Sequence, residues 1–335
     1  MFSRSPGILS LWLALATSGI WPALAAAQSP ATGSPPSTNQ TAATESEVAG
    51  PATATSPTSL SLRTDGRDVV TYNAAFLASP NPKTPWFGRS GFIDPVRTPS
   101  GIAVTDGFPS DHLHQHGIMF AWTSSSISGR KIDFWNSAKI EGLVQHAGID
   151  SASDDEIVVR LQHIDQGTQP PSVAIEETWK ITRVEHPTMT VFDLQSTQVC
   201  VLPHPVDILE YHYGALCVRG NDQWRGENRV MQTDSHPDAI TANHTRPTWA
   251  SMSGRVEGKL AGIVAISHPD NFRSPQPVRM HPSEPYFCFA PMVLGEFQLK
   301  PQEPYVSRCR FAAYDGDLDV NAVEKLCDFS SDASF

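Results

Sequence analysis

The chain has little positive charge and few long apolar runs. Its 24 Lys and Arg residues are outnumbered by 35 Asp and Glu residues, which gives a formal net charge of −11 at pH 7. Because nucleic acids and anionic membranes are bound through basic surfaces, neither is expected as a partner. Beyond the first 27 residues no stretch reaches the roughly 18 consecutive apolar residues of a transmembrane helix, so no membrane span is expected there.

Cysteine is scarce as well. The five cysteines show no spacing typical of a metal site, and an odd number leaves at least one thiol unpaired within a monomer. Export would permit disulfide bonds, but most of these residues lie in or beside apolar, strand-like stretches, which favours buried free thiols. The five are Cys200, Cys217, Cys288, Cys309 and Cys327.

The first 58 residues have the composition of a leader and a spacer. Arg4, the apolar run 7–16 and the small residues at 23–28 follow the layout of a secretory signal peptide, with an uncleaved anchor as the alternative. We predict a signal peptide over 1–27 and therefore export to the periplasm or the cell exterior. Residues 28–58 are rich in Pro, Ser, Thr and Ala and are predicted to form a disordered stalk. A single domain is expected over 59–335.

The domain sequence alternates between apolar and polar residues with the period of β-strands. Asp65-Gly66 between two such runs predicts a hairpin. Helix is expected only at 137–147 and 320–329. The clearest strands are expected at 156–164, 173–184, 188–199, 213–220, 259–268, 284–291 and 305–316. Many strands and few helices predict an all-β fold, a large antiparallel β-sandwich.

The stretch SDHLHQHGIMFAW, residues 110–122, concentrates candidate chemistry. If the chain is extended here, His112, His114 and His116 share one face and could hold zinc or another divalent metal, although no HExxH or CxxC motif supports this. Imidazole also titrates near neutral pH, which suits acid–base catalysis or substrate binding. A structural role at a sheet edge is the third interpretation.

The stretch GRKIDFWN, residues 129–136, is a second candidate. It places the Asp133 carboxylate beside the indole of Trp135. Aromatic faces stack on sugar rings while carboxylates bind hydroxyl groups, so these two residues are candidates for substrate binding. Two core aromatic residues beside an exposed carboxylate are the alternative.

Two further polar stretches are candidates for the walls of a site. Residues 210–226 combine aromatic and charged side chains, and Arg219 could hold a substrate oxygen by charge-assisted hydrogen bonds. Residues 267–285 form a polar, Pro-rich segment between two strands, which is either a site wall or a rigid surface connection. The candidate substrate-binding residues in these stretches are Tyr213, Arg219, Trp224, Arg279 and His281.

Several short motifs occur in a fixed order: TPSGIAVTDGFPSDHLHQHGIMFAW, DFWN, YHYGALCVRG, RPTWASMSG, AGIVAISHPDNFRSPQPVRM and YDGDLD. In this order they resemble the PmoA-related family of bacterial exported proteins, over roughly residues 68–318. The resemblance implies a β-supersandwich like those of galactose mutarotases and polysaccharide lyases. The matching polar positions are Asp111, His112, His114, Asp133, Tyr213, Gly214, Arg219, Trp249, His268, Pro269 and Asn271.

The resemblance adds His268 and Asn271 to the candidate substrate-binding residues. It also argues against His116 as a metal ligand, because family members carry Arg or Lys at this position and a ligand should not be exchanged for a cation. The family name suggests a methane oxygenase, whose membrane subunit needs transmembrane helices that are absent here after the leader.

These observations predict an exported protein that processes a carbohydrate or glycoside by hydrolysis, elimination or epimerisation. His112 or His114 would be the acid or base, oriented by Asp111. Arg219 and Arg279 would hold substrate oxygens, and the rings of Trp135 and Trp224 would stack on a sugar. The alternatives are a non-catalytic carbohydrate-binding module and a metal-dependent oxygenase or hydrolase. A divalent metal is the only cofactor considered.

Overall fold

The structure is a computed structural model that describes residues 57–330. The predicted signal peptide (1–27) lies outside these residues, and so does the predicted stalk (28–58) apart from its last two residues.

Three antiparallel sheets make up the described part of the chain. The seven-stranded sheet has the order β1 (Ser59–Thr64), β2 (Arg67–Asn73), β3 (Phe92–Val96), β4 (Ile118–Ala121), β12 (Ala215–Arg219), β17 (Tyr286–Phe289) and β16 (Val278–Met280). The eight-stranded sheet has the order β13 (Val230–Thr233), β14 (Trp249–Val256), β15 (Lys259–Ser267), β19 (Pro304–Asp315), β10 (Met189–Cys200), β9 (Ser172–Val184), β8 (Glu156–Asp165) and β7 (Gly142–Ala152). The four-stranded sheet has the order β18 (Phe297–Leu299), β11 (Val206–Ile208), β5 (Ser125–Ile127) and β6 (Arg130–Ile132).

Helices are few and short. The two α-helices are α1 (Ala239–Ala242) and α2 (Val320–Leu326), and the 3₁₀ turns are η1 (Pro85–Phe87), η2 (Ser137–Lys139), η3 (Gly226–Asn228) and η4 (Pro291–Leu294). Among residues 57–330, no helix has the length and apolar character needed to cross a membrane.

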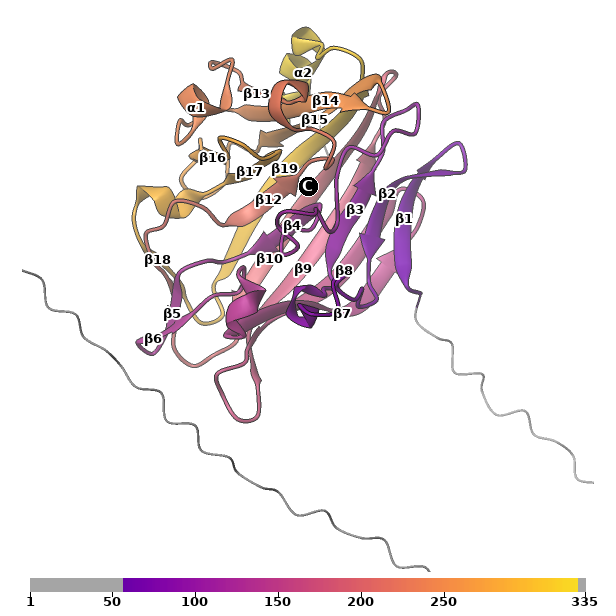
Figure 1. Ribbon diagram of the computed structural model, residues 1–335. Coiled ribbons are helices and arrows are strands. Elements are labelled where there is room, and N and C mark those ends of the chain that lie inside the picture. The colour runs from indigo at the N-terminus through magenta and orange to yellow at the C-terminus, as the bar shows by residue number, and fades with distance from the viewer. Residues whose placement is uncertain (1–56, 331–335) are drawn as a thin grey trace, which may run out of the picture. The chain divides into compact units, whose positions relative to one another are not determined.

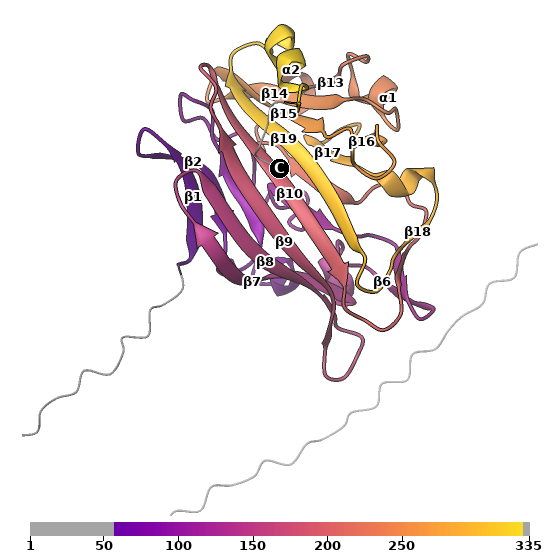
Figure 2. The ribbon, with the colours of Figure 1, turned by 180° about the vertical axis from the view of Figure 1, so that it is seen from behind.

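The two large sheets pack face to face. Figure 1 shows β1 to β4 in front of β8 to β10, and the reverse view in Figure 2 exchanges them. The core lies between the sheets, where the ring of Tyr72 on β2 meets that of Trp179 on β9 with centroids 6.0 Å apart. Both side chains are fully buried, and burial of each large aromatic side chain contributes about 2–3 kcal/mol. The predicted all-β antiparallel sandwich is confirmed.

Local sequence signals account for several elements. Asp65 and Gly66 have positive φ values of 50° and 72° and connect β1 to β2, as the hairpin prediction required. The seven clearest strand predictions correspond to β8, β9, β10, β12, β15, β17 and β19, and the predicted helix at 320–329 is α2. The thiol prediction is also confirmed, since all five cysteines are free and only Cys327 is less than fully buried.

The helix predicted at 137–147 is wrong. Residues 137–139 form the turn η2, Ile140 takes a left-handed conformation with φ 53°, and β7 begins at Gly142. The apolar spacing of the segment suits a helix, but β7 pairs along most of its length with β8 at the edge of the eight-stranded sheet. This long-range pairing outweighs the local preference.

Candidate functional site

Strand alternation assigns side chains to the two faces of the seven-stranded sheet. Tyr72 pairs with Ile93 and Ile93 with Ile118, and this row faces the eight-stranded sheet because Tyr72 contacts Trp179. The row continues through Val218, Phe287 and Met280. The opposite face therefore carries Cys217, Arg219, Arg279, Tyr286 and Cys288.

A pocket of about 300 Å³ lies on this outer face. It is lined by His112, His114, Gln115, Trp135, Asn136, His212, Tyr213, Arg279, His281 and Tyr286. The lining comes from four separate segments of the chain, so the sheet gathers residues that are distant in sequence. The ten described lining residues include four imidazoles, one guanidinium and no carboxylate.

The stretch 110–117 is a loop, so the extended conformation that would place the three histidines on one face is not formed. The N–H of His112 bonds to the carbonyl of Pro109, and the N–H of Gln115 bonds to the carbonyl of His112. These turns bring the rings of His112 and His114 to a centroid distance of 5.6 Å in the pocket.

His116 belongs to the core beneath this loop. It is 2% exposed, and its Nδ1 lies 2.7 Å from the carbonyl oxygen of Gly107. Burial is the main cause that lowers its pKa well below the usual value, and the positive charge of Arg89 adds to the effect. The three histidines therefore do not share one face, and the interpretation of all three as ligands of one metal does not fit the structure.

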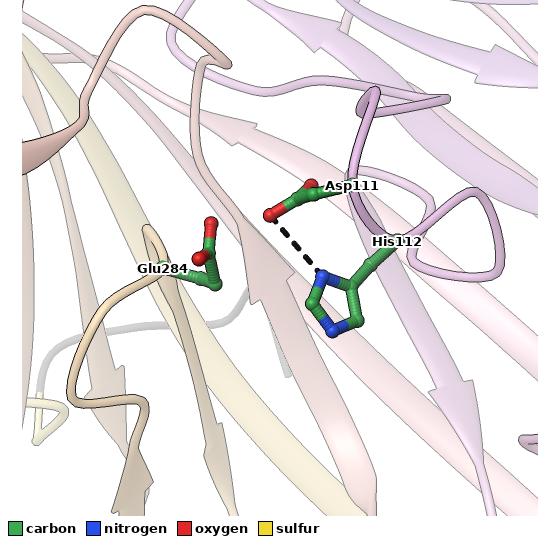
Figure 3. Close-up of side chains that lie close together, drawn as sticks. All are labelled: Asp111, His112 and Glu284. Atoms are coloured by element: carbon green, nitrogen blue, oxygen red, sulfur yellow. Dashed lines mark ion pairs between the residues drawn. The ribbon is translucent and has the colours of Figure 1, made fainter.

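Asp111 and His112 form a pair at the rim of the pocket (Figure 3). Nδ1 of His112 lies 3.1 Å from Oδ2 of Asp111, at an angle short of a well-aligned hydrogen bond. An ionised carboxylate only accepts hydrogen bonds, so the charge of Asp111 favours the tautomer of His112 that carries its proton on Nδ1. Nε2, on the far side of the ring, is then the basic nitrogen, and the His112 ring lines the pocket.

Two arginines hold the Asp111 carboxylate. Nη2 of Arg219 donates to Oδ1 at 2.8 Å, and Nη1 of Arg225 donates to Oδ2 at 3.1 Å. Partial burial acts to raise the pKa of Asp111, but hydrogen bonds with Glu284 and Arg225 and the charge of Arg219 outweigh it, so that this pKa lies well below its usual range. The carboxylate beside His112 therefore stays ionised.

Glu284 completes the cluster of charged side chains formed by Asp111, Arg219 and Arg225. Its Oε2 accepts a hydrogen bond from Nη1 of Arg225 at 2.8 Å and lies 3.9 Å from Nη2 of Arg219. Its pKa is raised, first by the hydrogen bond it shares with Asp111 and then by burial. Asp222 also pairs with both arginines. The cluster orders the loops around the Asp111–His112 pair.

Asp111, His112 and Glu284 are also the set of described residues whose ligand atoms are close enough to hold a metal ion, within 4.8 Å of one another (Figure 3). The residues present do not suit a divalent cation, because both carboxylates already accept hydrogen bonds from Arg225 and one accepts from Arg219. A cation bound there would lie beside two guanidinium charges. The cluster fits an ion-pair network that orients His112.

Two more histidines of the pocket stay neutral near pH 7. Burial, and then the charge of His112, lower the pKa of His114 to about 4. Burial and the charge of Arg279 lower the pKa of His281 to about 4. Nδ1 of His281 accepts the backbone N–H of Glu284 at 3.0 Å, so the neutral ring carries its proton on Nε2. The pocket thus offers imidazole N–H groups as donors.

Asp133 acts through its neighbours. It is 3% exposed, accepts the backbone N–H groups of Trp135 and Asn136, and accepts from Nδ2 of Asn136 at 2.7 Å. Nδ2 of Asn136 in turn donates to the hydroxyl of Tyr213 at 3.2 Å. Burial raises the pKa of Tyr213 to about 12 and outweighs the hydrogen bond with Asn136, which lowers it, so the hydroxyl remains protonated. Asp133 positions Asn136 and Tyr213 and does not line the pocket itself.

Of the residues predicted to bind substrate, Trp135, Tyr213, Arg279 and His281 line the pocket. Arg219 is fully buried beneath it and is already bonded to Asp111 and Gln115, so it holds the loop and is not free to hold substrate. The prediction missed Gln115, Asn136, His212, Glu284 and Tyr286. In the sequence His212 is next to Tyr213 and Asn136 is next to Trp135. This adjacency to predicted residues is the signal that could have identified them.

Three other predicted residues lie away from the pocket. Trp224 is fully buried and packs against Gly220 and Gly254, where an added Cβ would meet its ring, so it cannot stack on a sugar. His268 packs against the ring of Phe329. Asn271 bonds to the backbone of Arg308 and to Ser267, which ties its loop to the end of β19. The contacts of all three side chains stabilise the fold, and none of the three side chains lines the pocket.

The comparisons with known proteins give one matching family and two solved structures that resemble this one. The model of a family of unknown function, DUF6807, matches residues 59–328. None of the curated proteins matches the chain. The structure is similar to that of a galactose mutarotase related enzyme from Lactobacillus acidophilus, with a TM-score of 0.41 and 8% identity over 77% of this chain and 97% of that one. It is also similar to a heparan sulfate lyase from Pedobacter heparinus, with a TM-score of 0.29 and 9% identity over 74% of this chain and 33% of that one.

The predicted membership of the PmoA-related family is wrong, because the family model that matches is a different one. The motifs behind that prediction are short, and several have local structural roles here. Asp133 binds backbone amides, Asn271 ties a loop to a strand, and Gly254 leaves room for Trp224.

Proposed function

Since the chain belongs to the family of unknown function DUF6807, we propose its activity from the site: it is an acid–base enzyme that moves a proton on a carbohydrate, with His112 as the base. The observation that carries the proposal is the Asp111–His112 pair: the carboxylate, whose pKa is lowered, lies 3.1 Å from Nδ1 of a ring that lines the pocket, which favours Nε2 as the basic nitrogen. An imidazole oriented in this way is a suitable general base near neutral pH.

Proton donors surround the base. The ring of His281 lies 6.1 Å from that of His112 between centroids and carries its proton on Nε2. The hydroxyl of Tyr213, held by Asn136, stays protonated. Either group can stabilise a developing oxyanion by a hydrogen bond, and the imidazolium formed on His112 can return its proton to the substrate.

Carbohydrate is the substrate class that suits the pocket. Its volume of about 300 Å³ is at the lower end for small-molecule sites. Many hydrogen-bonding groups converge on it, and the partly exposed ring of Tyr213, packed against the buried Trp135, supplies aromatic surface. Sugars combine many hydroxyl groups with an apolar C–H face, which matches this mixture.

The lining favours isomerisation or elimination over hydrolysis. Most glycoside hydrolases use two carboxyl groups on either side of the scissile bond. No carboxylate lines this pocket, and Asp111 and Glu284 at its edge are committed to Arg225. We also retain export as part of the proposal, on the basis of the sequence of residues 1–27.

The test is a screen of mono- and oligosaccharides with the full chain in D₂O, followed by proton NMR. We expect at least one sugar to show anomer or epimer exchange, deuterium incorporation or a new alkene signal. The same sugar should be unchanged with His112→Asn. The proposal fails if no sugar reacts, or if His112→Asn reacts as fast as the wild type.

A further inference from the structure

The pocket has a charge opposite to that of the whole chain. The formal net charge is −11, yet the ten lining residues include one arginine, four histidines and no acid. Asp111 and Glu284 at the edge of the pocket are paired with Arg219 and Arg225, so the unpaired charge that faces the pocket is positive and favours an anionic ligand. A neutral sugar would need no such arrangement.

Arg279 supplies the fixed charge. Its Nη1 donates a hydrogen bond to Oδ1 of Asn243 at 3.0 Å, and this amide oxygen carries no formal charge. Within residues 57–330 Arg279 makes no ion pair within 4.0 Å, whereas Arg219 and Arg225 nearby each contact three carboxylates. A guanidinium group has five N–H donors, so most of those of Arg279 remain for a ligand.

The position of Arg279 is fixed from behind. Oδ1 of Asn243, directly after α1, also accepts the backbone N–H of Met280 at 3.2 Å. Arg279 lies on β16, which pairs with β17, and faces the same side as Tyr286. A guanidinium group held in this way is suited to bidentate binding of a planar carboxylate.

The neighbouring histidines extend the same binding surface. Burial, and then the charge of Arg279, lower the pKa of His212 and of His281. Both rings line the pocket, and His281 carries its proton on Nε2. A carboxylate on Arg279 would find neutral N–H donors beside it and no competing anion among the lining residues.

We propose that the substrate is an acidic sugar, and that Arg279 binds its carboxylate while His281 donates a second hydrogen bond. This inference rests on the proposed function, because it places a carboxylated sugar in the pocket that holds His112. Arg279 is then a substrate-binding residue that selects uronates over the matching neutral sugars.

Isothermal titration of the full chain with matched sugars tests this selection. The probes are D-glucuronate and D-galacturonate, the neutral D-glucose and D-galactose, and N-acetylglucosamine 6-sulfate as a sulfated anion. We expect at least one uronate to bind about tenfold or more tightly than its neutral partner and than the sulfated sugar. Arg279→Gln should remove that preference, and Arg279→Lys should keep part of it.

Arg255→Gln is the matched control, since Arg255 is exposed, lies outside the pocket and carries the same charge. It should bind uronates like the wild type.

The inference is overturned if uronates and neutral sugars bind within about threefold of each other, if the preference survives Arg279→Gln, if the sulfated sugar binds best, or if no uronate binds at about 10 mM. Turnover of a neutral sugar that depends on His112, without uronate preference, would overturn this inference alone. Uronate binding through Arg279 without turnover that depends on His112 would overturn the proposed function alone.

Discussion

Two of the histidine–carboxylate pairs in the described residues have similar contacts and different surroundings. Nδ1 of His112 lies 3.1 Å from Asp111, and Nε2 of His163 lies 2.7 Å from Glu177. The side chains of the first pair are 36% and 21% exposed, and those of the second pair are 0% exposed. The first is at a pocket and the second is sealed in the core.

The surroundings of the sealed pair give it a structural role. Glu177 accepts hydrogen bonds from Trp179, Ser196 and Gln198, besides its contact with His163. Gln198 also accepts from the indole of Trp122, which follows β4, so the network joins the two large sheets. A histidine–carboxylate pair therefore indicates catalysis only where one ring nitrogen can reach a substrate.

The strongest test of the difference is His112→Asn. We expect kcat on the best sugar from the screen to fall by about 10²–10⁴, the range for loss of a general base. The free energy of unfolding should change by less than about 0.5–1 kcal/mol, because the side chain is partly exposed. Steady-state kinetics and urea unfolding measure the two quantities. Large loss of stability with kcat unchanged would make this pair structural as well.

Glu177→Gln should show the opposite behaviour. The amide removes one acceptor oxygen and places an NH₂ group among buried donors, which costs about 3–4 kcal/mol of unfolding free energy. The molecules that remain folded should keep their kcat, because the network does not reach the pocket. Urea unfolding followed by Trp fluorescence measures the loss. A change below about 1 kcal/mol would contradict the structural role.

Much of the fold could be predicted from the sequence because its signals are local. Alternation along β8, β9 and β10 and the Asp65-Gly66 turn depend on neighbouring residues only. The edge strand β7 was missed, since its pairing with β8 depends on the tertiary structure and its apolar spacing also suits a helix.

The site was only partly predictable because its contacts are long-range. His112 and His114 were found from their density in one short stretch. The bond between Asp111 and Arg219 joins residues 108 positions apart, and nothing local indicates that Arg219 is buried beneath the pocket. Trp224 likewise resembles a sugar-stacking residue in sequence, and only its packing against Gly254 shows that it belongs to the core.

Asp111→Asn tests what the carboxylate contributes to the accessible pair. It should lower kcat about 10–100-fold with little change in KM, because the neutral amide no longer favours the proton on Nδ1. The control is Asp222→Asn, which removes another carboxylate from Arg219 and Arg225 without touching His112. It should change kcat less than about threefold. Equal losses in both variants would mean that Asp111 acts only through the arginine cluster.

The smallest expected effect is on the pH dependence of stability. The pKa of His114 is about 4 in the folded protein, mainly because of burial, against an ordinary value near 6.5. Between these values the unfolded chain binds a proton that the folded protein does not, so stability falls as the pH is lowered through this window. His114→Asn should remove this contribution, about 2 kcal/mol between pH 7 and pH 4.5. Urea unfolding of both proteins at pH 7 and pH 4.5 measures the difference. If the variant loses as much stability as the wild type over that interval, His114 is not held neutral in the folded protein, and the pocket would carry more positive charge in acid than its buried imidazoles imply.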